Sequence, residues 1–322
     1  VLGVGRSLIQ LTYDRFAGVV PSDNVWVVTN QKYVSLVHEQ LPEIPLNHIL
    51  SEPCRRNTAP CIAYVSWRIK KENPKANIVV SPSDHIVTNE AEFKRVITNC
   101  LKFTAETDAV VTLGMKPTRP ETGYGYIQAD LSTASARNRE IYRVDQFREK
   151  PDLSTAEQYI KQNNFFWNAG IFIWSASTIV NAFRIYQPSI ARIFERIMDV
   201  LDTADEQRVI DEVYPECENI SVDYAIMEKA EEIFVCPADF GWSDLGTWGS
   251  LLAQTQHDIY GNAVIGNDVH LFDSKNCIIH TTEERKVVIQ GLDGYIVAEQ
   301  DGKLLICRLS EEQRLKQFTG EG

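Results

Sequence analysis

The stretch Ile78-Val79-Val80-Ser81-Pro82-Ser83-Asp84-His85 decides the fold class, because an apolar β-branched run ends there in a polar turn. Such a run predicts a short, fully buried strand. In open α/β sheets, ligands bind just beyond the carboxyl ends of the strands, which is where Asp84 lies. Its carboxylate is a hard oxygen donor that could hold Mg²⁺ against a triphosphate. An Asx turn at the end of a strand would use the same residue, and His85 is interpreted as structural.

Around this strand, short β-rich runs alternate with amphipathic stretches from Val25 to Val111, which predicts a mainly parallel, Rossmann-like α/β sheet flanked by helices. After Pro120 the pattern becomes mixed, and several helices follow between Ala176 and Lys229. The fold class expected for the domain as a whole is therefore α/β, with a Rossmann-like mixed sheet flanked by helices. The expected strands are Val25–Thr29, Ile78–Ser81, Ala109–Leu113, Tyr126–Ala129, Ile141–Arg148 and Gly170–Trp174, and the expected early helices are Pro60–Lys71 and Glu90–Phe103.

Beyond His257 the sequence changes to short strand-like runs separated by Gly, Asn and Asp, which predicts a small all-β appendage. We therefore expect two domains, 1–256 and 257–322, and the second could pack against the first or mediate a homodimer. The expected strands are Ala263–Ile265, Val269–Phe272, Cys277–His280, Val287–Gln290, Tyr295–Ala298 and Leu304–Arg308.

The composition excludes some classes of function. A formal net charge of −12 argues against a nucleic-acid partner, since phosphate backbones are bound by clustered Lys and Arg. No apolar stretch is long enough to cross a bilayer, and the first residues do not read as a signal peptide, so we expect a cytoplasmic protein with no membrane contact. The seven cysteines lack metal or redox spacing and are interpreted as plain thiols.

Two motifs before expected secondary structure are candidates for ligand contacts. Arg56, Asn57 and Thr58 precede a helix, where free backbone amides and a guanidinium would favour an anion or a base, although a capped helix uses the same residues. The segment Gly123-Tyr124-Gly125-Tyr126 combines glycines, which permit close backbone approach, with tyrosines that can pack on a sugar or base. A tight hairpin entry would also fit that segment.

Further candidates lie at the ends of later elements. Glu149 and Lys150 end a strand, and offer a carboxylate for sugar hydroxyls and an ammonium for a phosphate. Asn168 and Gly170 begin another strand, where the amide could bind hydroxyls or form a turn. Asp223 and Asp244 are read differently: the position of Asp223 is typical of the first turn of a helix, which needs no function, whereas Asp244, in a loop rich in Gly and Trp, could be a second metal-binding carboxylate.

The two glycines of Gly3-Val4-Gly5, near the N-terminus, resemble part of a phosphate-binding loop. No strand precedes this segment, and it completes neither a dinucleotide nor a Walker pattern, so we reject a phosphate-loop interpretation. Ser7-Leu8-Ile9-Gln10 is instead typical of a capping box that begins a helix.

Taken together, seven motifs resemble those of the bacterial mannose-1-phosphate guanylyltransferases, members of the nucleotidylyltransferase family, in that family's order along nearly the whole chain. Each motif is weak alone, but the ordered set is specific. The motifs are EPCRRNTAP, SPSDH, ETGYGYI, FREKP, NAGIFIW, SVDYAIMEKA and WSDLGTW.

The resemblance implies a nucleotide-diphospho-sugar transferase fold and a reaction of GTP with mannose 1-phosphate that gives GDP-mannose and pyrophosphate. It implies Mg²⁺ on Asp84 and Asp244, Lys150 at the sugar phosphate, and Glu149 and Asn168 at the mannose hydroxyls. It also implies that Gly123–Tyr126 approaches the sugar and that Arg56–Thr58 lie near the nucleotide. Two alternatives stay open: a related enzyme that joins UTP or dTTP to glucose 1-phosphate, and a non-catalytic regulatory homologue that binds a sugar nucleotide.

The start of the chain departs from the family pattern. Members open with a strand and a Gly-rich loop that contains Arg and is followed by Pro-Lys, whereas Val1–Ser7 resembles the segment that comes next. The expected triphosphate loop is thus missing from this sequence. A truncation, a disordered segment outside the numbering and a naturally shortened homologue would each give such a start.

Overall fold

The computed structural model describes residues 5–281, 285–300 and 302–319. The chain forms two compact units. The larger comprises Arg6–Ser83 and Val87–Trp242, and the smaller comprises Asp84–Ile86 and the described residues from Ser243 to 319, together with Gly5. The boundary passes through two short strands, β4 (Ile86–Val87) and β10 (Trp242–Ser243).

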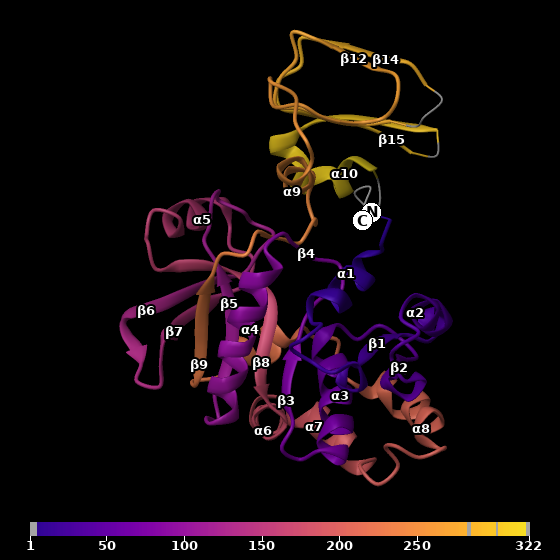
Figure 1. The fold of residues 1–322 in the computed structure, drawn as a ribbon, viewed down its shortest axis with the longest axis vertical. Coiled ribbons are helices and arrows are strands. Elements are labelled where there is room, and N and C mark those ends of the chain that lie inside the picture. The colour runs from indigo at the N-terminus through magenta and orange to yellow at the C-terminus, as the bar shows by residue number, and fades with distance from the viewer. Residues whose placement is uncertain (1–4, 282–284, 301, 320–322) are drawn as a thin grey trace. The chain divides into compact units, whose positions relative to one another are not determined.

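The larger unit contains a six-stranded sheet, a separate pair of parallel strands and eight α-helices among its described residues (Figure 1). The separate pair is β1 (Val27–Asn30) with β2 (Ile49–Glu52). The six strands are β3 (Asn77–Val80), β5 (Val110–Met115), β6 (Tyr126–Ser135), β7 (Asn138–Arg148), β8 (Phe165–Ser175) and β9 (Ile233–Ala238). The helices are α1 (Leu8–Arg15), α2 (Val34–Gln40), α3 (Thr58–Glu72), α4 (Glu90–Ala105), α5 (Leu153–Tyr159), α6 (Ala176–Tyr186), α7 (Pro188–Arg196) and α8 (Glu206–Val213).

The directions of the strands confirm the mixed sheet expected for the domain. The order is β3-β8-β5-β9-β7-β6, and of these neighbours only β5 and β9 are parallel; the other pairs are antiparallel. The mainly parallel pattern expected from residues 25–111 does not extend over the whole sheet. The cause is the segment after Pro120, because β6 and β7 form an antiparallel hairpin and β8 runs back between β3 and β5.

Both faces of this sheet are buried, which explains its continuous apolar strands. Along β8, Ile171 and Ile173 belong to the core that contains residues of α4, whereas Phe172 and Trp174 belong to the core that contains residues of α3, α6 and α7. This alternation follows the period of two in a strand. Packing on both faces holds these strands in place, and several candidate site residues lie on them or next to their ends.

The N-terminal helix begins as expected. Ser7 caps α1 by accepting from Gln10 N–H, and the Gln10 side chain accepts from Ser7 N–H, which is a full capping box. Of the rejected phosphate-loop motif, Gly3 and Val4 lie outside the described residues. No helix in the described ranges is both long and apolar enough to cross a membrane.

Among its described residues, the smaller unit contains short strands in two sheets and two α-helices. Three strands stack in parallel in one sheet, which an antiparallel fourth extends, and two parallel strands form a second sheet. The first sheet contains β11 (Ala263–Ile265), β13 (Ile278–His280), β15 (Tyr295–Gln300) and β16 (Lys303–Arg308); the second contains β12 (Val269–Phe272) and β14 (Val287–Gln290); the helices are α9 (Trp248–Gln254) and α10 (Leu315–Thr319). All six expected strands are present.

Candidate functional site

The end of β7 places a carboxylate and an ammonium side by side. Glu149 has a side chain that is only 12% exposed, whereas Lys150 is 60% exposed, and Lys150 Nζ lies 3.7 Å from Glu149 Oε1. Lys150 has φ of +44°, in the left-handed region that lysine rarely adopts. Non-glycine residues in this region cluster at functional sites, where the surrounding structure holds them.

Glu149 titrates far from its ordinary range. Burial is the largest cause, and the negative charge of Asp223 adds to it, whereas Lys150 opposes both, so that the pKa of Glu149 rises to about 7. Its Oε2 atom is buried and makes no hydrogen bond within the described residues. A buried acceptor without a partner is costly, and a ligand that donates a hydrogen bond there would remove the cost.

Asn168, on the neighbouring strand β8, has a fixed side-chain amide. Its Oδ1 accepts hydrogen bonds from Thr112 Oγ1 at 3.0 Å and from Gly170 N–H at 3.2 Å. Its Nδ2 donates to Asp223 Oδ1 at 2.9 Å. Because an amide nitrogen has two hydrogens, one N–H of Asn168 is left for a ligand.

Gly125 allows Glu149 and Asn168 to approach β6. A Cβ atom at Gly125 would collide with Glu149 Oε2 and lie 3.3 Å from the Cβ of Asn168. The backbone N–H of Asn168 donates to the Gly125 carbonyl at 2.8 Å. Any residue other than glycine at position 125 would therefore force the Glu149 side chain to move.

The rest of that segment is structural. Gly123 N–H donates to the buried carboxylate of Glu121, which shapes the turn. Tyr124 is 7% exposed and packs edge-on against Trp167 and Trp242, with ring centroids 5.2 and 5.3 Å apart. Tyr126 is fully buried in the same core. Both rings therefore pack on protein, and the expectation that a sugar stacks on them is not met. Gly125 is the residue of this segment that lies against Glu149 and Asn168.

Arg56, Asn57 and Thr58 lie at the N-terminus of α3. Asn57 has φ of +64° and ψ of −169°, a combination that is almost restricted to glycine, and its side chain accepts from Thr58 N–H. Arg56 Nη2 donates to the Pro215 carbonyl at 2.5 Å. Thr58 Oγ1 accepts from Val222 N–H at 2.9 Å, which ties this helix start to the segment that carries Asp223.

Asp84 and Asp244 both belong to the smaller unit. The Asp84 side chain is 72% exposed, with His85 Nε2 3.8 Å away. Asp244 accepts from Gly246 N–H at 2.9 Å, and Leu245 between them has φ of +50°, so this turn too holds a strained residue. Within the described ranges, no three His, Cys, Asp or Glu side chains form a metal site by themselves.

One carboxylate at this site is not among those predicted from the sequence. Asp223 has a sufficient explanation there as ordinary first-turn chemistry, yet it contacts Asn168 and raises the pKa of Glu149. It begins a π-helical turn, η5 (Asp223–Met227), a rare form that is frequent at functional sites. The signal is present in the sequence, since SVDYAIMEKA is one of the seven ordered motifs.

The cluster formed by Glu149, Lys150, Asn168 and Asp223 can bind a polyhydroxylated anion. Glu149 Oε2 can accept from a hydroxyl, Asn168 can donate to one, and the exposed ammonium of Lys150 can meet a phosphate. Hydrogen bonds fix the Asn168 amide in one orientation, whereas the Lys150 side chain is exposed.

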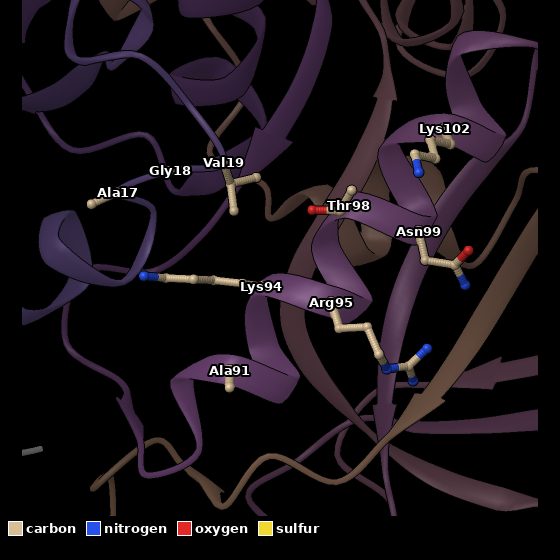
Figure 2. Close-up of a pocket in the computed structure, with 9 residues that line it drawn as sticks. All are labelled: Ala17, Gly18, Val19, Ala91, Lys94, Arg95, Thr98, Asn99 and Lys102. Atoms are coloured by element: carbon tan, nitrogen blue, oxygen red, sulfur yellow. The ribbon is translucent and has the colours of Figure 1, made fainter.

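A separate cavity of about 490 Å³ lies between the exposed face of α4 and the Ala17–Val19 segment. Figure 2 shows that Lys94 extends toward this segment while Arg95 points away from it. Lys94 lies 4.0 Å from Glu90, and Arg95 is paired with Glu92 and Glu140. None of the site residues expected from the sequence lines this cavity.

Comparison with known proteins shows the family to which the chain belongs. Residues 1–260 match the family model described as nucleotidyl transferase. The chain is 35% identical to the xanthan biosynthesis protein XanB of Xanthomonas campestris over 98% of its length and 66% of that protein, and 33% identical to a mannose-1-phosphate guanylyltransferase of Escherichia coli over 97% of its length and 68% of that protein. The chain thus spans about two thirds of the length of these curated relatives.

A solved structure is similar over nearly the whole fold. The crystal structure described as mannose-1-phosphate geranyltransferase from Thermus thermophilus matches 99% of this chain and 90% of its own, with a TM-score of 0.84 and 28% sequence identity. The family model covers most of the chain, including the Glu149, Asn168 and Asp223 cluster. The chain belongs to the nucleotidyl transferase family.

Proposed function

We propose that this protein is a mannose-1-phosphate guanylyltransferase, which transfers GMP from GTP to mannose 1-phosphate and releases GDP-mannose and pyrophosphate. The observation that carries the proposal is the Glu149, Lys150 and Asn168 cluster, which combines hydroxyl-binding groups with one exposed cation. Relatives that align over nearly all of the chain carry this activity in their names. The guanylyl specificity rests on those names and on the NAGIFIW and WSDLGTW motifs.

In this mechanism, the side chains position the two reactants. Lys150 Nζ binds the phosphate of mannose 1-phosphate, while Glu149 and the free N–H of Asn168 bind the mannose hydroxyls. A phosphate oxygen of the sugar then attacks the α-phosphorus of GTP, the bond to the β-phosphate oxygen breaks, and pyrophosphate leaves. Arg56, Asn57 and Thr58 would lie near the nucleotide. No covalent enzyme intermediate is formed.

Asp84 and Asp244 are the residues that would hold Mg²⁺. Two carboxylates, completed by substrate phosphates and water, are a donor set that Mg²⁺ accepts, and the exposure of Asp84 leaves its oxygens accessible. When bound, the ion would offset the negative charge that develops at the α-phosphate.

The domain assignment forms part of the same proposal. Residues 1–256 would be the catalytic domain, and residues 257–322 a small β-helix-like domain that could serve homodimer formation. The parallel stacking of β11, β13 and β15 supports the second description.

Pyrophosphate release tests the function. The protein is expressed from its own start codon, beside the chain printed here, and is assayed with GTP, mannose 1-phosphate and Mg²⁺. We expect Mg²⁺-dependent release with equimolar GDP-mannose, and a loss of at least about 100-fold in kcat/KM for both Asp84→Asn and Asp244→Asn. Full activity in those variants would contradict the metal assignment. Tight GDP-mannose binding without turnover in either protein would favour the regulatory alternative.

A further inference from the structure

Asp223 is a partly buried carboxylate that the proposed mechanism leaves without a role. It begins the π-helical turn η5, and its neighbours Ala225, Ile226 and Met227 are buried in the core. This anchoring holds the Asp223 carboxylate in place. Burial is the largest cause of its raised pKa, which the hydrogen bond from Asn168 and the charge of Lys150 oppose. Burial of a carboxylate costs free energy unless hydrogen bonds or opposite charges offset it, and such groups are common at functional sites.

The first effect of Asp223 is on the Asn168 amide. A flipped amide would turn its NH₂ group toward Gly170 N–H and its oxygen toward the Asp223 carboxylate, so that a donor would face a donor and an acceptor an acceptor. Asp223 and Gly170 therefore select the same amide orientation from opposite ends. The remaining Asn168 N–H is left as a donor in a fixed direction.

The second effect is on Glu149. The charged and titratable groups that face Glu149 are Asp223, Lys150 and Glu228, and the Glu149 N–H donates to Glu228 Oε1 at 3.2 Å. Among these carboxylates Asp223 has the larger effect on the pKa of Glu149. Burial raises the pKa of Glu149 most, and the charge of Asp223 raises it further.

We propose that Asp223 is a positioning residue of the sugar-phosphate site, which acts through Asn168 and Glu149 to set the donor and acceptor pattern that the sugar hydroxyls meet. This role rests on the proposed function. The role is carried by the hydrogen bond from Asn168 to Asp223 Oδ1 and needs no contact between Asp223 and the substrate.

The test is the Asp223→Asn variant, assayed in the protein expressed from its own start codon across pH 5.5 to 9. We expect the KM for mannose 1-phosphate to rise about tenfold while the KM for GTP stays within about twofold. The inflection in kcat/KM for mannose 1-phosphate should move down by about one pH unit, since loss of the Asp223 charge lowers the pKa of Glu149. Asp223→Glu should keep that inflection and still raise the KM.

Two control variants match Asp223→Asn. Tyr224→Phe changes an exposed residue of the same turn, and Glu218→Gln removes a carboxylate from an exposed position in the preceding segment. Both should leave the two KM values and the pH profile unchanged. Thermal unfolding at pH 8 should show Asp223→Asn at least as stable as wild type, because a partly buried charge is removed.

The outcomes separate this role from the proposed function. A wild-type protein that makes no GDP-mannose would overturn the proposed function and the role together. An active wild type whose Asp223→Asn variant keeps its KM for mannose 1-phosphate and its pH profile would overturn the role alone. A variant that unfolds would also overturn it, and so would one whose kcat/KM falls equally for mannose 1-phosphate and for GTP. Asp223 would then be a structural residue.

Discussion

At the scale of single residues, Glu149 illustrates what a binding site costs the unbound protein. Its pKa rises from about 4.5 to about 7 on folding, so the folded state binds a proton more tightly than the unfolded state. The stability that the protonated carboxyl contributes is present below pH 4.5 and is lost as the pH rises through 7. Glu149 should therefore destabilise the free protein at pH 8.

This cost predicts that Glu149→Gln stabilises the protein in a pH-dependent way. The free energy of unfolding should increase by about 1–3 kcal/mol at pH 8 and hardly change at pH 4.5, as measured by urea unfolding. Activity with mannose 1-phosphate should fall at the same time. Equal effects of the substitution at both pH values would show that Glu149 is not desolvated, and Glu218→Gln, at an exposed position, serves as the control.

Lys150 also costs the unbound protein stability, in this case through its backbone conformation. A left-handed lysine costs about 1–2 kcal/mol, and glycine in its place would recover this at an entropic cost of about 0.5–1 kcal/mol. Lys150→Gly should thus raise the free energy of unfolding by about 0.5–1 kcal/mol while it weakens the binding of the sugar phosphate. Arg148→Gly, at a regular position of β7, should instead lower stability, and a stability loss in both variants would contradict the strain at Lys150.

Sequence motifs predict most of these residues but not their connections. Glu149, Lys150 and Asn168 stand out because the motifs FREKP and NAGIFIW belong to the ordered set of seven. Asp223 lies in another motif of that set, but an acid in the first turn of a helix has a sufficient local explanation. Its contact with Asn168 joins residues 55 positions apart, which no local pattern encodes.

At the scale of elements, a buried arginine joins α3 to the start of α8. The Arg68 side chain is 2% exposed, its Nε lies 3.3 Å from Glu206, and it also pairs with Asp202. Its guanidinium lies 5.1 Å from the centre of the Trp26 ring. Removing one partner of a buried ion pair leaves the other charge uncompensated.

We expect Arg68→Met to lower the free energy of unfolding by about 3 kcal/mol in urea. Arg208→Met on α8 is the matched control, because Arg208 pairs with Glu212 at 3.0 Å while both side chains are more than 60% exposed. That variant should change stability by less than about 0.5 kcal/mol. Similar losses in the two variants would show that the Arg68 network does not stabilise this end of α3.

The strands and helices expected from the sequence overlap those observed, but β2 and β9 are not among the expected strands, and the direction of each strand is not predicted either. The apolar runs at β3, β5 and β8 are buried on both faces, as their composition indicates. Alternation of strands and helices predicts parallel pairing, but β8 follows a hairpin and enters the sheet antiparallel. Pairing is set by contacts distant in the sequence, and periodicity carries no information about them.

At the scale of the whole molecule, the residues that the motifs single out divide between the two units. Glu149, Lys150 and Asn168, which are proposed to bind the sugar phosphate, lie in the larger unit. The two proposed metal ligands, Asp84 and Asp244, lie in the smaller. The segments 84–86 and 243–319 are far apart in the sequence and share one unit. The acidic net charge of −12 is compatible with an anionic substrate, because the proposal places a local cation, the exposed Lys150, at the phosphate.

A substrate panel tests the central claim most directly. The protein expressed from its own start codon is given GTP, UTP or dTTP with mannose 1-phosphate or glucose 1-phosphate, and the nucleotide sugars are separated and quantified. We predict that kcat/KM for GTP with mannose 1-phosphate exceeds every other pair by at least about 100-fold, because a site built to bind one base leaves polar groups unpaired with another. Preferred formation of a UDP- or dTDP-sugar would contradict the account.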